Sequence, residues 1–500
     1  KYLQDEALAK QIRDNPNDLV IDFETELARD MVLATEKGFR DGMLGDAMPL
    51  LEQRAATQQA IITKALAARG VDWIELAAPT QGAPKAKVTL STDHPDNRAV
   101  AGETLKVTAT VENVGDAPFA QLQALTRSEN EHLEGHEFLF GNVPPGETRS
   151  WTVSMKVPKS ALTRRDPLDI EFKAGAGAAP ENATLKVAIE QLPRPRFALR
   201  YHLDDSTLGN GDGVLQAGEE AELVVEARNV GDGDAQAVVG ILRNDDADEQ
   251  RGIFITRGRV KTDALARGQV SELRFKFKVK EQLEQAAVPV DVAVSDSEIR
   301  ETTSEKVNLR VSLPSEVLEV AKVRLQPKTP GGLVELRSLY ATGAPIWGRA
   351  PDAVSDARLG RWYRVPARVG DAKGWAWVDA DTVSVGSDAD DRTATTAEAV
   401  EISGPPVIAL SDRAPPPETR DDALTLSGEV LGERLVQDLL IYVNNKKVFF
   451  KANNAGLAAT DPFRFSARVP LDEGVNRITV IARQDDEASS RRTMIVHREK

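Results

Sequence analysis

An internal duplication constrains the fold of this chain more than any other feature of its sequence. Two motifs recur at a constant offset of 116 residues: Ala101-Gly102-Glu103 as Ala217-Gly218-Glu219, and Asn113-Val114-Gly115-Asp116 as Asn229-Val230-Gly231-Asp232. Farther along, Leu185, Val187 and Ile189 match Val307, Leu309 and Val311 at an offset of 122. The second copy therefore contains six inserted residues, and we expect them in a loop.

Apolar and polar residues alternate between the two motifs of each copy. Every second position is apolar: Leu105, Val107, Ala109 and Val111 in the first copy, and Ala221, Leu223, Val225 and Ala227 in the second. Successive side chains of a β-strand point to opposite faces, so this spacing places one face in a core and one in water. Several such strands between Gly- and Asn-rich turns favour a β-sandwich. We predict one sandwich at 87–190 and a second at 197–313.

Length, cysteine content and charge restrict what the whole chain can be. At 500 residues it is too long for a single hydrophobic core, so several domains are expected. The absence of cysteine excludes disulfides, thiolate catalysis and cysteine zinc sites. The formal net charge of −15 argues against nucleic acid as a partner, because phosphate binding needs clustered Lys and Arg. No apolar run approaches the roughly 20 residues of a membrane span.

The beginning of the chain has a different, helical periodicity. Apolar residues recur at spacings of three and four along 18–69, which predicts two amphipathic stripes: Phe23, Leu27, Met31 and Ala34, then Leu51, Ala55, Ile62 and Leu66. Gly70 stands where a helix would end. Two helices alone cannot bury both stripes, so we interpret residues 1–75 as the tail of an upstream domain. The start at Lys1 also indicates a fragment or a processed form. A linker at 76–86 follows.

A short acidic segment of the second copy fits the second half of a calcium-binding loop. Asn210-Gly211-Asp212-Gly213, followed by Glu219, matches part of the pattern D-x-[DN]-x-[DN]-G-x5-E. The first ligand position lacks an acid, which Asp204 or Asp205 replaces if the loop folds back. We predict a Ca²⁺ site whose ligands are Asp205, Asn210, Asp212 and Glu219. The alternative is an acidic, solvated turn before a strand.

Residues 318–386 contain four of the six tryptophans of the chain. Alternating aromatic residues fill the core of a small barrel, whereas those on the opposite face line a groove. Both interpretations remain open from the sequence. If a ligand groove exists, we assign it to Trp347, Tyr363 and Trp375.

The last part of the chain alternates again. We interpret 387–403 as a polar linker and 405–499 as a further sandwich, with Leu439, Ile441 and Val443 facing its core. Asn444-Asn445, between two apolar runs, predicts a tight hairpin turn.

No catalytic constellation is recognisable, so we assign no catalytic residue. The chain contains no Gly-x-Ser-x-Gly, Walker or His-Glu-x-x-His motif. His132, Glu134 and His136 alternate and would share one face of a strand, but no third strand ligand is evident. Solvent-exposed histidines are the alternative to a zinc site.

Several of these segments resemble known bacterial modules. "ENVGD" followed by "VPPGETRSWTVSMKVP" is similar to the Ig-like modules called CARDB domains. "GRWYRVPARVGDAKGWAWVDADTVSV" resembles the bacterial SH3-like module, in which the groove often binds cell-wall peptides or carbohydrate. The segment at 405–499 resembles an Ig-like module that commonly ends secreted bacterial enzymes. These resemblances imply folds more than functions.

The order of the parts resembles the C-terminal half of envelope serine peptidases of the carboxyl-terminal processing family, S41. In that family a Lys activates a nucleophilic Ser, and a PDZ domain delivers the substrate; neither motif occurs in this chain. The resemblance implies a non-catalytic tail that is joined to an upstream peptidase core.

The sequence therefore predicts a mainly β protein: a helical segment, tandem Ig-like sandwiches, a small SH3-like barrel and a final Ig-like sandwich. We expect an accessory region that positions an envelope or secreted peptidase near cell-wall peptides or protein substrates, in the periplasm, the cell envelope or outside the cell. Calcium is the one cofactor expected. The alternatives are a free-standing adhesion or scaffold protein and an intrinsic hydrolase.

Overall fold

The computed structural model describes residues 44–244, 252–281, 286–386, 393–402, 404–411, 414–432, 435–454, 461–484 and 488–500. Strands dominate these residues, and the predicted fold class is confirmed: a helix is followed by β-sandwiches and a small barrel. The stripe of Phe23, Leu27, Met31 and Ala34 lies outside the described residues, as does the side chain of Leu51.

Helix α3 (Leu44–Ala67) ends against the first sandwich. Gly70, with φ of +81°, follows its last turn, and Val71 N donates to Leu66 O at 3.0 Å. This is the Schellman arrangement, in which the left-handed residue is most often glycine. Ile62 and Leu66 then pack with Val71 and Trp73. No helix in the described part of the chain is long and apolar enough to cross a membrane.

The first sandwich has two sheets around one core. One sheet has the order β1 (Ala86–Thr92), β3 (Thr104–Asn113), β6 (Thr148–Lys156). The other has the order β2 (Arg98–Val100), β8 (Ala183–Glu190), β7 (Arg164–Lys173), β4 (Phe119–Arg127), β5 (Glu137–Val143). A short 3-10 turn, η2 (Pro95–Asn97), lies between β1 and β2. Strand β2 is parallel to β8, whereas the other neighbours are antiparallel, as in immunoglobulin sandwiches.

The second sandwich repeats this plan. One sheet has the order β12 (Ile253–Arg257), β14 (Val270–Val279), β10 (Glu220–Asn229), β9 (Phe197–Asp204). The facing strands are β13 (Arg259–Thr262), β11 (Val238–Asn244), β15 (Ala287–Asp296), β16 (Thr302–Arg310). Leu215 pairs in parallel with Val311, as Ala99 does with Ile189 in the first copy. These partners differ by the offsets of 116 and 122 that the sequence predicts, so the duplication preserves register.

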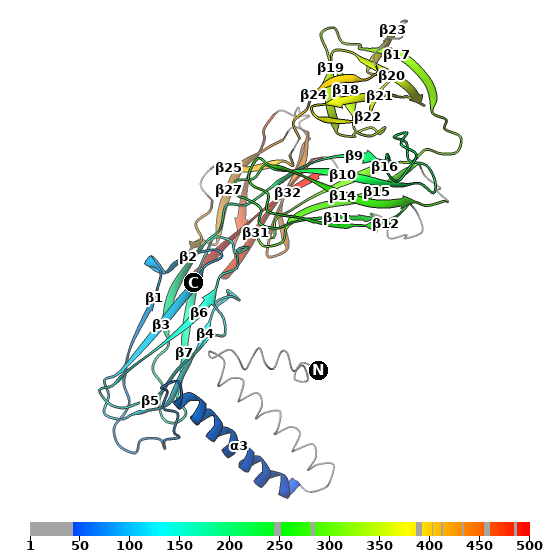
Figure 1. Cartoon of the computed structure of the whole chain (residues 1–500). Helices are drawn as coiled ribbons and strands as arrows, with labels where there is room; N and C mark the ends of the chain where they lie inside the picture. Colours follow the sequence, from blue (N-terminus) through cyan, green and yellow to red (C-terminus); the bar gives the residue numbers. More distant parts are fainter. Residues whose placement is uncertain are drawn as a thin grey trace.

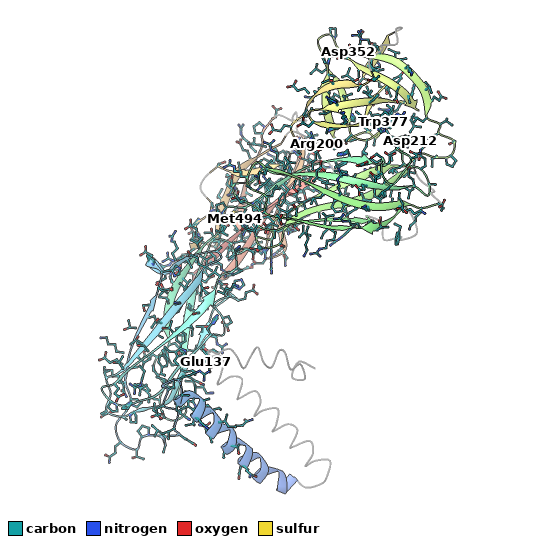
Figure 2. The ribbon with its side chains drawn as sticks, viewed as in Figure 1. Glu137, Arg200, Asp212, Asp352, Trp377 and Met494 are labelled. Carbon is teal, nitrogen blue, oxygen red and sulfur yellow. The ribbon has the colours of Figure 1, made fainter. Side chains whose placement is uncertain are left out.

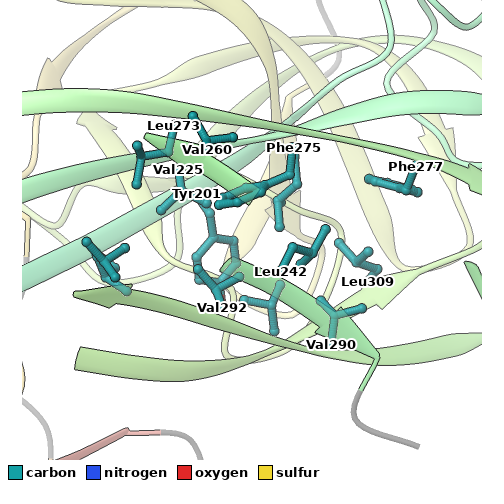
Figure 3. Packing of buried hydrophobic residues seen from close by; sticks show 14 of the residues in the cluster. Tyr201, Val225, Leu242, Val260, Leu273, Phe275, Phe277, Val290, Val292 and Leu309 are labelled. Carbon is teal, nitrogen blue, oxygen red and sulfur yellow. The ribbon is translucent and has the colours of Figure 1, made fainter. Parts of the chain in front are cut away.

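The six-residue insertion of the second copy was expected in a loop, and it falls between β11 and β13, where 245–251 lie outside the described residues. The described part of this segment contains strand β12, which pairs with β14. The first copy has no strand beside the corresponding β6 edge within its described residues. Strand β12 therefore widens one sheet of the second sandwich, and the position of the inserted residues stays a prediction. Figure 3 shows its core, in which Tyr201 and Phe275 of one sheet and Leu309 of the facing sheet belong to one hydrophobic cluster.

A small barrel follows. Its strands are β17 (Glu319–Pro327), β18 (Val334–Arg337), β19 (Ile346–Ala350), β20 (Ala353–Leu359), β21 (Trp362–Val369), β22 (Ala372–Asp379), β23 (Val383–Gly386) and β24 (Thr395–Ala399). Pairing of β22 with both β18 and β21 closes a ring that also contains β19 and β24. The prediction of a linker at 387–403 is therefore wrong at 395–399. Strand β24 pairs with β19 and β21 because the barrel needs it to close.

The last sandwich uses the same strand order a third time. One sheet contains β25 (Val407–Leu410), β27 (Ala423–Leu431) and β30 (Phe463–Pro470). The other contains β26 (Glu418–Thr419), β32 (Ala488–Arg498), β31 (Gly474–Gln484), β28 (Val436–Val443) and β29 (Lys446–Ala452), with β26 parallel to β32. The predicted hairpin between β28 and β29 is confirmed. Asn444 and Asn445 both have positive φ, 47° and 69°, as a type I′ turn requires.

The modules do not follow one another along a simple rod. Figure 1 shows that the last sandwich turns back after the barrel and lies beside both earlier sandwiches. Its strand β32 bridges to β16 of the second sandwich, where Glu305 pairs with Ala488. Lys186 of the first sandwich forms ion pairs with Glu418 and Glu499 of the last. Both contacts of the last sandwich therefore join segments that lie far apart in the sequence.

Candidate functional site

The acidic segment predicted to bind calcium connects β9 to β10 and folds back on itself. Asp205 is buried, and its Oδ2 accepts a hydrogen bond from Gly213 N at 2.7 Å. Asn210 Nδ2 donates to Asp212 Oδ2 at 3.0 Å, and Asn210 N donates to Glu219 Oε1 at 3.1 Å. The structure therefore brings the four predicted ligands into one loop. We call residues 205–219 the acidic loop.

The duplication explains part of this arrangement without a metal. Glu219 Oε2 accepts a hydrogen bond from Gln216 N at 2.9 Å. In the first sandwich Glu103, its counterpart, accepts the same bond from Val100 N at 2.7 Å. Both carboxylates thus stabilise the turn that precedes a strand. Glu219 has a structural role that it shares with a copy lacking the Asn-Gly-Asp-Gly segment.

The two most enclosed carboxyl groups of the acidic loop lie where burial and neighbouring carboxylates disfavour the charged form. Burial raises the pKa of Asp205, and the neighbouring charges of Asp212 and Asp204 act in the same direction. Burial likewise raises the pKa of Glu219, with Asp205 and Asp212 contributing. Among the described residues, no group of three or more His, Cys, Asp or Glu side chains is arranged to hold a metal ion. Calcium binding to this loop stays a prediction.

Calorimetric measurement of thermal unfolding with and without calcium tests the predicted Ca²⁺ site. If the acidic loop binds Ca²⁺, millimolar calcium raises the melting temperature, because a ligand that binds only the folded state stabilises it. Asp212→Asn removes one charged ligand and should abolish most of that increase. Glu103→Gln alters the equivalent turn of the first sandwich and should leave the calcium response unchanged. An unchanged melting temperature of the unmodified protein removes the calcium assignment.

The acidic loop also contacts the barrel. Trp375 Nε1 donates to Gly211 O at 2.9 Å, and Arg364 donates to Asp212 O at 2.5 Å. The Arg364 guanidinium lies 4.1 Å from the centre of the Trp375 ring, a cation–π distance. Figure 2 shows Asp212 and Trp377 close together where barrel and sandwich meet. We call this arrangement the loop–barrel contact.

Apolar burial reinforces the loop–barrel contact. Val214 packs in one cluster with the barrel residues Tyr340, Leu359, Trp362 and Trp377. Trp377 is nearly fully buried, and its ring centre lies 4.8 Å from that of Tyr340. The Tyr340 hydroxyl donates to Arg310 O at 2.5 Å, at the end of β16. Because these side chains come from two modules, barrel and second sandwich share part of a hydrophobic core.

This placement concerns the three aromatic residues assigned to a possible ligand groove. Trp347 and Tyr363 are buried in the barrel core, and Trp375 is covered by the acidic loop. The Trp347 ring also stacks on His202 of β9, with ring centres 6.0 Å apart. Trp347 and Tyr363 thus contribute to the barrel core, and Trp375 is half-buried on the outer face of β22, against the acidic loop. The ligand-groove assignment stays a prediction.

His202 is the titratable group in the stacking contact between β9 and the barrel. Its Nδ1 is buried and has no hydrogen-bond partner among the described residues. Burial lowers the pKa of His202, although the nearby carboxylates of Glu226, Glu272 and Asp204 oppose this effect and Arg274 adds to it. A lowered folded-state pKa means that the native structure prefers neutral imidazole. Its contribution is complete above the free value of about 6.5 and is lost as pH falls below it.

We expect the melting temperature of the unit formed by second sandwich and barrel to fall between pH 7.5 and 5.0. If the folded-state pKa of His202 lies one unit below the free value, protonation lowers the free energy of unfolding by up to about 1.4 kcal/mol. His202→Phe keeps an aromatic ring for stacking and removes the titrating group, so its stability should change less over the same range. Identical pH profiles for both proteins would exclude His202 as the source.

The alternating histidines of the first sandwich are arranged for a structural role. Glu134 forms an ion pair with Arg127 at 3.0 Å and accepts a hydrogen bond from Ser128 N at 2.6 Å. His136 Nε2 lies 3.2 Å from His132 O, so its ring contacts the backbone of the same turn. These residues lie in the turn between β4 and β5 rather than on a strand. These contacts stabilise the turn between β4 and β5.

Comparison with known proteins adds little to this description. No protein-family model and no curated protein matches the chain. A solved three-immunoglobulin structure of titin, in a Glu-to-Ala mutated variant, is similar at 9% identity and a TM-score of 0.16. The match covers 84% of this chain and 99% of the titin chain. At this TM-score the titin structure does not help to identify the fold, which we assign from strand order and register.

Proposed function

We propose that this chain is a non-catalytic binding and positioning region whose modules are held in a fixed mutual arrangement. The observation that carries the proposal is the density of specific contacts between modules. Flexibly tethered domains usually meet through small polar interfaces and move relative to one another. Here polar and apolar contacts connect each sandwich to its neighbour and the barrel to the second sandwich.

Arg194 connects the first two sandwiches. It lies in the segment between them and donates to Ser160 O at 2.8 Å on one side. On the other side it forms an ion pair with Glu301 at 2.5 Å. Lys159 and Glu298 form a second ion pair across the same junction at 2.5 Å. A planar guanidinium that bonds in two directions fixes both angle and distance.

The last sandwich is connected to the first by a cluster of charges. Lys186 donates to Glu418 at 2.5 Å and to Glu499, and these hydrogen bonds raise the pKa of Lys186. The hydrogen bond from Lys186 is the main reason that the pKa of Glu499 falls to about 2. Glu129 also accepts a hydrogen bond from Val475 N at 2.6 Å. Contacts of this kind add specificity of orientation more than stability.

The finer proposal is that this region serves an envelope or secreted serine peptidase of the S41 type. Its support is the order of the parts: helices ahead of two sandwiches, an aromatic barrel and a final sandwich. Protein substrates suit the arrangement better than cell-wall peptides, because the three aromatic side chains assigned to a groove are covered. The missing Ser and Lys belong to the upstream core in this proposal.

A free-standing scaffold or adhesion protein is the second candidate, and one observation favours it. The end of α3 already packs on the first sandwich through Trp73 and Leu139. Gln121 Nε2 donates to Trp73 O at 3.0 Å, and Asn142 Nδ2 donates to Ile74 O at 2.9 Å. That end of the helix needs no partner from another domain.

The reading frame upstream of Lys1 separates the two candidates. The peptidase proposal expects a PDZ domain and a core with the nucleophilic Ser and its Lys, encoded in frame. A start codon a short distance upstream, or an unrelated domain there, would favour the scaffold. The purified chain itself should cleave neither casein nor unstructured peptides, and cleavage by it would contradict the non-catalytic assignment.

A further inference from the structure

Strand β29 of the last sandwich forms an open edge. It is the outermost strand of its sheet and pairs with β28 along Lys446–Ala452. Among the described residues, no strand pairs with its other side. The backbone groups on the free side of an edge strand can hydrogen-bond to an added strand, and several peptide-binding domains recognise ligands in this way.

The open edge is basic, although the chain as a whole is acidic. Between 444 and 470 the sequence has five basic residues and one acidic residue, whereas the formal net charge of the chain is −15. Lys446, Lys447 and Lys451 of β29 are all exposed. Within the described structure none of these three lysines forms an ion pair. On β30, in the other sheet, Arg464 and Arg468 have side chains 77% exposed and form ion pairs with Glu429 at 3.5 Å and Asp422 at 3.4 Å.

An aromatic side chain lies among these cations. Phe450 is 51% exposed, and Lys447 Nζ lies 5.8 Å from its ring centre. Lys451 is held in place, because its Nζ donates to Arg464 O at 2.6 Å and lies 5.1 Å from the Phe463 ring centre. A half-exposed ring between ordered cations provides apolar area for one side chain of an incoming strand.

Lysine on an edge strand normally protects a sheet from pairing with other chains. That protection acts against neutral and basic strands, because they would bury or oppose the lysine charges. A strand with carboxylates facing Lys446 and Lys451 is attracted instead. The opposite edge of the same sheet, β13, shows the contrast: Arg259 and Lys261 are exposed there, but the intervening Val260 is buried and no aromatic residue is present on the strand.

We propose that β29 binds an extended, acidic segment of a partner protein as an additional strand. Its carboxylates lie on the face of β29 that carries Lys446 and Lys451, and on the other face, beside Lys447, an apolar side chain covers Phe450. This inference rests on the proposed binding role and specifies the partner by its chemistry.

Binding of short acetylated peptides to the whole chain tests the proposal. The probe alternates Glu and Val, and the comparison peptide has Lys in place of Glu. We expect the acidic peptide alone to bind, with protection of the β29 backbone amides from hydrogen exchange. Lys446→Glu with Lys447→Glu should weaken binding at least about tenfold, while the matched control Arg259→Glu with Lys261→Glu stays within about twofold.

Three results would overturn the proposal: no binding of the acidic peptide, equal binding of both peptides, or binding without protection in β29. The lysines are exposed, so both double variants should keep the melting temperature of the unmodified protein. Phe450→Ser adds an uncharged test, and it should weaken binding at unchanged charge. If the acidic peptide does not bind, the proposed fixed arrangement of the modules still stands, because that arrangement is tested separately by distances within the chain.

Discussion

We expect the replacement of Asn113 with Ala to destabilise the first sandwich by about 3 kcal/mol. Asn113 is fully buried, and its Nδ2 donates to Ala117 O at 2.9 Å and to Val143 O at 2.8 Å. Its Oδ1 accepts a hydrogen bond from Gly115 N at 3.0 Å. Alanine leaves three backbone groups without partners in a site that water does not reach, and each such group costs about 1 kcal/mol or more.

The duplication supplies an internal replicate of this experiment. Asn229 Nδ2 donates to Gly233 O at 2.9 Å and to Leu265 O at 3.0 Å, and Gly231 N donates to Asn229 Oδ1 at 3.0 Å. Asn229→Ala should therefore destabilise the second sandwich by a similar amount.

Native-state hydrogen exchange resolves the two effects, because it measures opening within each module. Asn308→Ala, at an exposed position of β16, is the control and should change stability by less than about 0.5 kcal/mol. A loss below about 1 kcal/mol at both buried asparagines would contradict the structural role assigned to the repeated motif.

We expect Gly213→Ala to separate the barrel from the acidic loop. Gly213 has φ of +75°, and a Cβ there would lie 2.6 Å from Trp375 Cδ1. Alanine therefore has two costs: a left-handed backbone conformation of about 1 kcal/mol and displacement of the Trp375 ring. We expect a red shift of tryptophan fluorescence and faster hydrogen exchange along β22.

The matched control for this variant is Gly268→Ala. Gly268 has a similar φ of +82° in a turn of the same sandwich, but no atom lies within 4 Å of the position of its Cβ. It carries the backbone cost without the collision. If both variants show the same fluorescence and exchange along β22, Trp375 does not hold the barrel against the acidic loop.

Much of the fold was predictable because the repeat encodes register. Leu105 pairs with Met155 in the first sandwich, and Ala221 pairs with Phe277 in the second, at the predicted offsets of 116 and 122. Gly115 and Gly231 recur for the same reason: a Cβ at either position would collide with the backbone of the preceding segment. Alternation and conserved spacing within one chain report contacts inside a module.

Contacts between modules were not predictable in the same way. Alternation places Trp375 and Trp377 on the outer face of β22, but an outer face covered by another module has the same pattern as one that lines a groove. The sequence did not indicate the contacts of Arg364 and His202, because a single charged or imidazole side chain does not reveal which module packs on it. The shared role of Glu103 and Glu219 was visible in the repeat and weakens the calcium interpretation of Glu219.

The central claim is that the modules keep one fixed arrangement, and a distance measurement between spin labels tests it most directly. The chain has no cysteine, so labels can be attached at introduced cysteines, Glu181→Cys in the first sandwich and Asp263→Cys in the second. We predict a single narrow distance distribution that broadens when Arg194→Ala removes the bridge to Ser160 and Glu301. A broad distribution in the unmodified background, unchanged by Arg194→Ala, would contradict the claim.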